Sequence, residues 1–94
     1  MIFIINNLKY DTDNMELISE KCKYRYESSN IFRGFFFPGK NVKLFRSKKG
    51  RWLLTYNTDY DTRAVAMTES KVKELLLRYD YLVYEKIFGE IEEA

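Results

Sequence analysis

The spacing of hydrophobic and polar residues changes several times along this chain of 94 residues. Residues 1–5 form a short apolar run, Asn6-Asn7 favours a tight turn, and residues 8–10 can return as a second strand. In residues 22–27, apolar and charged side chains alternate with the two-residue period of a half-buried strand. The beginning of the chain therefore predicts a β-hairpin followed by another strand.

A short helix is expected between the hairpin and this strand. Asp11 or Thr12 suits its N-cap, and one apolar side would be formed by Met15, Leu17 and Ile18. The helix would end near residue 20, where the two-residue period begins.

The middle of the chain predicts further strands. Residues 31–37 are one candidate, and Pro38-Gly39 after them favours a turn because proline presets φ and glycine accepts a positive φ. Residues 42–46 and 51–57 flank the polar segment 47–50, which is typical of a β-hairpin. The second strand of this hairpin would carry Trp52, Leu54 and Tyr56 on one face.

The C-terminal part predicts helix. Thr68 suits an N-cap, and apolar residues follow at the i, i+3, i+4 and i+7 positions of an amphipathic helix: Val72, Leu75, Leu76 and Tyr79. The apolar stripe continues to Ile91, so the region forms either one long helix or a first helix and a second one capped by Asp80.

Together these elements predict a single compact α+β domain over residues 1–94, because a chain of this length supports one modest core. We expect a mostly antiparallel sheet of four to six strands with a short N-terminal helix and one or two C-terminal helices packed on it. The expected divisions are a hairpin and short helix (1–20), the sheet (21–57), a loop (58–67) and the helical region (68–93).

The amino-acid composition limits the catalytic and metal-binding chemistry that the chain can support. The chain has no histidine and one cysteine, so it lacks the commonest general base and offers no cysteine- or histidine-rich metal site. No phosphate-binding glycine loop and no catalytic-serine motif occurs. We therefore expect no enzyme, no cofactor and no metal.

No apolar run reaches the roughly 20 residues that a bilayer-crossing helix needs. The first residues also lack the basic flank and cleavage site of a secretory signal. We expect a protein of the bacterial cytoplasm without a membrane partner.

Positive charge is concentrated in the first part of the chain. Residues 1–51 carry 11 Lys/Arg and 5 Asp/Glu, whereas residues 52–94 carry 5 and 9. The stretch KLFRSKKGRWLL favours either a well-solvated turn or a surface for phosphates or for acidic groups of a partner protein. The candidate binding residues are Lys40, Lys43, Arg46, Lys48, Lys49 and Arg51.

Aromatic residues supply a second candidate surface. Phe35, Phe36 and Phe37 cannot all point to one side of a strand, so the strand is either buried on both faces or exposes a ring for binding. The candidate aromatic interface comprises Tyr24, Tyr26, Phe35, Phe36 and Phe37. The same strand is the first candidate for a homodimer interface.

Four segments taken in order resemble a family of small proteins from Firmicutes and their phages and mobile elements. The segments are NNLKYDTDNMELI, KLFRSKKGRWLL, VAMTESKVKELL and YEKIFGEIEEA. The residues that match are Asn7, Lys9, Tyr10, Asp11, Thr12, Ile18, Leu44, Phe45, Arg46, Lys48, Gly50, Trp52, Leu54, Met67, Thr68, Tyr84, Ile87, Phe88, Gly89, Glu92 and Glu93. The chain departs from the family in the loops at residues 26–30 and 56–61.

The resemblance implies an accessory protein of a phage or mobile element, in a genomic niche that includes anti-CRISPR proteins. It favours binding to a host defence protein, such as a CRISPR-Cas effector or its guide-RNA complex, and inhibition of that protein. The alternative is a small nucleic-acid-binding protein that uses the basic hairpin 40–51 for phosphates, with Tyr24, Tyr26 or Phe35 stacked on exposed bases.

Overall fold

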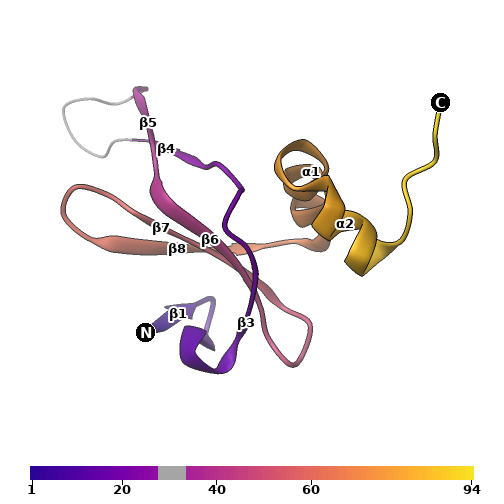
Figure 1. Cartoon of the computed structure of the whole chain (residues 1–94). Helices are drawn as coiled ribbons and strands as arrows, with labels where there is room; N and C mark the ends of the chain where they lie inside the picture. The colour runs from indigo at the N-terminus through magenta and orange to yellow at the C-terminus, as the bar shows by residue number, and fades with distance from the viewer. Residues whose placement is uncertain (28–33) are drawn as a thin grey trace.

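The computed structural model describes residues 1–27 and 34–94 and confirms the α+β class (Figure 1). Residues 28–33, which hold part of one predicted loop and the start of the predicted strand 31–37, lie outside the described residues. In the described residues, strands form three antiparallel sheets and two helices follow at the C-terminal end. The strands are β1 (Ile2–Ile5), β2 (Leu8–Asp11), β3 (Glu16–Ser19), β4 (Arg25–Glu27), β5 (Phe36–Pro38), β6 (Lys40–Arg46), β7 (Trp52–Asn57) and β8 (Thr62–Met67), and the helices are α1 (Glu69–Tyr79) and α2 (Tyr81–Phe88).

The predicted N-terminal hairpin is confirmed. β1 and β2 pair with Ile5 opposite Leu8, so Asn6 and Asn7 form a two-residue turn. Both asparagines have positive φ, 51° and 64°, which is the backbone that a type I′ hairpin turn requires and asparagine tolerates.

The predicted short helix before residue 20 is wrong. Only a single 3₁₀ turn forms, Thr12–Asn14, and the Asp11 carboxylate caps it by accepting the Asp13 amide at 3.1 Å. The chain then becomes β3, which pairs with β6. A segment this short gains little as an isolated helix, whereas strand pairing satisfies its backbone and buries Ser19.

The largest sheet has the order β3-β6-β7-β8, with every neighbouring pair antiparallel. The predicted β-hairpin 42–57 forms its centre, and Gly50 closes the turn with a φ of 81°. The two helices pack on one face of this sheet. The buried core there contains Cys22, Val42, Leu44, Trp52, Leu54, Tyr56, Val72, Leu75 and Leu76.

The predicted loop 58–67 is wrong over its second half, because Thr62–Met67 form β8 and pair along the whole of β7. Ala64 and Ala66 alternate with Arg63, Val65 and Met67 in this strand. The alanines weaken the apolar alternation that identifies a strand in a sequence. Pairing with β7, which is buried along most of its length, therefore determines the structure of this segment.

The C-terminal region forms two helices. The Thr68 side chain caps α1 by accepting the Lys71 amide at 3.2 Å, as expected for an N-cap. Asp80 ends α1 and precedes α2, with φ −153° and ψ 63°. Its non-helical backbone breaks the apolar stripe into two short helices.

Pro38-Gly39 forms no reversing turn. β5 ends at Pro38 and β6 begins at Lys40, and the Gly39 amide between them donates to the Tyr24 carbonyl at 2.8 Å. A side chain at Gly39 would place its Cβ 2.9 Å from Tyr56 Cβ. The glycine is therefore required for close approach to Tyr56.

Candidate functional site

β5 and the residue before it present phenylalanines to solvent. Phe35, Phe36 and Phe37 expose 62%, 51% and 42% of their surface, so the interpretation of a strand buried on both faces is wrong. Within the residues that the structure describes, β5 pairs with β4, and the two form a small sheet separate from the main one (Figure 1). Large aromatic side chains exposed in a group are typical of protein interfaces.

The tyrosines predicted for this interface pack against Tyr56 of β7. Tyr24 and Tyr26 are half-buried, and their ring centroids lie 5.0 Å and 5.4 Å from that of Tyr56. Tyr26 also lies 6.1 Å from the Phe37 ring. Burial, and then the neighbouring Tyr24, raise the pKa of the Tyr56 hydroxyl. These rings form a packed base that anchors the β4-β5 pair on the sheet.

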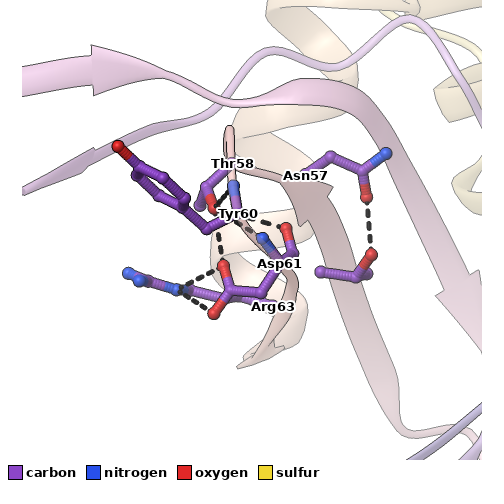
Figure 2. Close-up of polar contacts among 6 residues, drawn as sticks. Asn57, Thr58, Tyr60, Asp61 and Arg63 are labelled. Carbon is purple, nitrogen blue, oxygen red and sulfur yellow. Dashed lines mark hydrogen bonds and ion pairs between the residues drawn. The ribbon is translucent and has the colours of Figure 1, made fainter.

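The turn between β7 and β8 adds an aromatic residue that was not predicted (Figure 2). Tyr60 is 96% exposed at the tip of this turn. The Thr58 hydroxyl donates to the Asp61 carboxylate at 2.6 Å and accepts the backbone amides of Tyr60 and Asp61 at 3.1 Å and 3.0 Å. Because these bonds fix the turn, Tyr60 projects from an ordered backbone. The position of Tyr60 between Asp59 and Asp61 is the feature of the sequence that could have predicted this exposure.

Arg63 connects the turn to the aromatic residues. Its Nε donates to both Asp61 oxygens, at 3.1 Å and 3.3 Å, and its guanidinium lies 5.8 Å from the Tyr26 ring (Figure 2 shows the Asp61 contact). The Thr58 hydrogen bond, and then Arg63, hold the pKa of the Asp61 carboxyl below its usual value. We call Phe35, Phe36 and Phe37, together with Tyr26, whose ring packs on that of Phe37, the aromatic end.

The six predicted cations do not form one cluster in the structure. Lys40 forms an ion pair with Asp59, which raises the pKa of the lysine. Arg46 lies 3.5 Å from a Glu16 oxygen and 5.5 Å from the Trp52 ring. Lys43 contributes to a hollow beside Phe3 and Thr55. Lys48, Lys49 and Arg51 line one hollow at the turn between β6 and β7, and Arg46 lines another with Lys48.

Lys9 lies beside the cations of this turn, although it is far from them in the sequence. A hollow of about 500 Å³ between the N-terminal hairpin and this turn is lined by Lys9 together with Lys48, Lys49 and Arg51. Lys9 lies more than 30 positions earlier in the chain, so only the docking of the hairpin brings it there.

The described residues contain no group of three or more His, Cys, Asp or Glu side chains that could hold a metal ion. Within residues 1–27 and 34–94, neither helix is long and apolar enough to cross a membrane. No family model matches the chain, and neither a curated protein nor a solved structure is similar to it.

Proposed function

We propose that the protein is an accessory protein of a phage or mobile element that binds a bacterial defence protein and inhibits it, as an anti-CRISPR protein does. The partner proposed is a CRISPR-Cas effector. The resemblance of the four sequence segments to mobile-element proteins supports the biological setting, and the aromatic end supports binding to a protein.

The exposure of Phe36 and Phe37 on one short, anchored strand is the observation that carries the proposal. Burial of these rings against a partner would remove apolar surface from water, which contributes about 25 cal/mol per Å². Tyr26 packs against Phe37 and against Tyr56, which Tyr24 also contacts. A preorganised surface of this kind loses less conformational entropy on binding than a flexible one.

Two ion pairs lie next to the aromatic end. Lys40 pairs with Asp59, and Arg63 pairs with Asp61. Such a rim is typical of protein interfaces, where charged groups at the edge set orientation and aromatic groups at the centre supply most of the affinity. The basic hairpin 40–51 is less suited to the alternative function, which is nucleic-acid binding, because two of its six cations lie in ion pairs.

Affinity capture with purified CRISPR effectors tests the proposal. The tagged protein is mixed with each effector of a panel, in the apo form and loaded with guide RNA, and retention is measured with and without nuclease treatment. We expect at least one effector to be retained after nuclease treatment and its DNA cleavage to fall as the protein is added.

A matched pair of variants locates the contact. Phe36→Asp with Phe37→Asp places two charges in the proposed interface. Tyr81→Asp with Leu82→Asp changes two residues of α2 that are 55% and 62% exposed. Loss of retention with the first variant and not with the second supports the aromatic end. No retained effector, or equal loss with both folded variants, contradicts the proposal.

A further inference from the structure

A groove separates α1 from the segment 20–25, which leads from β3 into β4. Its volume is about 1080 Å³, and it extends to Pro38 and Gly39 at the base of β5. Buried apolar side chains, Cys22, Val42 and Leu75, contribute to its lining. None of these three is an exposed binding group, so the polar residues of the groove determine what it can hold.

Cations dominate the polar lining. Lys21, Lys23 and Arg25 come from the segment beside the groove, and Lys71 and Arg78 come from α1. Glu20 and Glu74 are the acidic members of the lining. The groove therefore has an excess of three positive charges, although the whole chain has a net charge of only +2.

The cations form two rows. Lys21, Lys23 and Arg25 are exposed and alternate with Cys22 and Tyr24, which belong to or pack against the core. Alternate residues of an extended chain lie about 7 Å apart. Lys71 and Arg78 are seven positions apart on α1, or about 10.5 Å along the helix. Two such rows suit a linear ligand that carries negative charges at regular intervals.

These cations are largely available to a ligand. In the described part of the chain, the ion pairs include only one of the five, Lys71, which lies 3.5 Å from Glu74. The Arg78 guanidinium lies 5.7 Å from the Tyr79 ring. Arg25 donates to the Phe36 carbonyl at 3.5 Å, at the outer limit of a hydrogen bond.

We infer that this groove binds a single-stranded nucleic acid, with the five cations on its phosphates. Tyr24 and Tyr79 are partly exposed members of the lining. Tyrosine rings favour unpaired bases over an acidic peptide, because bases stack on aromatic faces and carboxylates do not. Lys and Arg contacts to phosphate do not depend on the sugar, so RNA and DNA are both ligands. The groove borders the β4-β5 pair at Tyr24, Arg25 and Pro38, but the inference does not depend on the proposed protein interface at Phe36 and Phe37.

Fluorescence anisotropy tests the site with short labelled oligomers of uridylate and thymidylate. A ligand held by these phosphate contacts loses affinity as salt rises, with a slope of log K against log salt of about −2 to −3.5 for three to five contacts. A labelled polyglutamate peptide of the same length serves as the competing polyanion.

Variants of equal charge change distinguish the groove from the basic hairpin. Lys21→Glu with Lys23→Glu should weaken oligomer binding about tenfold or more and flatten the salt slope. Lys71→Gln with Arg78→Gln tests the opposite wall by neutralisation. Lys48→Glu with Lys49→Glu, which changes the net charge as much as the first pair does, should weaken binding less than about threefold.

Thermal unfolding of each variant establishes that it is folded before binding is compared. The inference is overturned if the wild-type chain binds neither oligomer or if polyglutamate binds as tightly as they do. It is equally overturned if the change at Lys48 and Lys49 removes binding while both groove variants retain it.

Discussion

Ser19 and Asp80 meet in the interior, where the Ser19 hydroxyl donates to an Asp80 carboxylate oxygen at 2.7 Å. Ser19 ends β3, and Asp80 lies between α1 and α2, 61 positions later in the chain. Both residues are buried, at 5% and 8% exposure. A buried carboxylate requires hydrogen-bond donors. We therefore expect this contact to hold the helices against the sheet and to fix the break between α1 and α2.

Ser19→Ala should lower the free energy of unfolding by about 1 to 3 kcal/mol, because it removes a donor from a buried carboxylate. Urea denaturation measures the change. Ser70→Ala is the control, since Ser70 is exposed in the first turn of α1 and should change stability by less than about 0.5 kcal/mol. Equal effects of the two substitutions would contradict a structural role for the Ser19 contact.

Gly39→Ala should disturb the anchoring of the aromatic end. The new methyl group would lie 2.9 Å from Tyr56 Cβ and 3.1 Å from ring atoms, and such overpacking destabilises by about 1 to 3 kcal/mol. We expect the near-ultraviolet circular dichroism of the tyrosines to change as well.

Gly50→Ala is the comparison for Gly39. It meets no atom within 4 Å but has a φ of 81°, so it should destabilise by about 1 kcal/mol without changing the tyrosine signal. An unaltered signal in Gly39→Ala would show that Tyr56 does not depend on the glycine.

Stability should fall at alkaline pH in a way that depends on Cys22. Burial raises the pKa of the Cys22 thiol, with a smaller contribution from Asp80 and an opposing one from the Ser19 hydrogen bond. Above the ordinary thiol pKa of about 8.5, the unfolded chain loses this proton before the folded chain does. Stability therefore decreases as pH rises through that interval.

Urea denaturation from pH 7 to pH 10 measures this dependence in the wild type and in Cys22→Ala. The substitution leaves a small cavity and should lower stability at pH 7, but the difference between the two chains should narrow as pH rises. A constant difference would show that the thiol pKa is the same in the folded and unfolded states.

The sequence predicted those turns and caps whose structure depends on residues close together in the chain. Asn6-Asn7, the segment 47–50 and Thr68 each specify a turn or cap through their own backbone and side chains, and all three predictions are confirmed. β3 and β8 were missed because pairing with β6 and β7, rather than their own pattern, makes them strands.

The candidate surfaces depend still more on tertiary contacts. The sequence identified Phe35, Phe36 and Phe37 but could not decide between burial and exposure, which depends on the partners of β5. Five cations in one groove come from segments about 50 positions apart. The cations at 40–51 line different hollows, because Lys40, Lys43 and Arg46 lie along β6 whereas Lys48 and Lys49 lie in the turn after it.

The most direct test of the central claim is inhibition of DNA cleavage by a CRISPR effector that the protein retains in affinity capture. The effector is titrated with the wild-type chain and with the Phe36→Asp, Phe37→Asp variant. We expect the wild type to inhibit and the variant to need at least about thirtyfold more protein, equivalent to the loss of one interface hot spot. Inhibition by the folded variant at the wild-type concentration, or no inhibition of any effector in the panel, would contradict the claim.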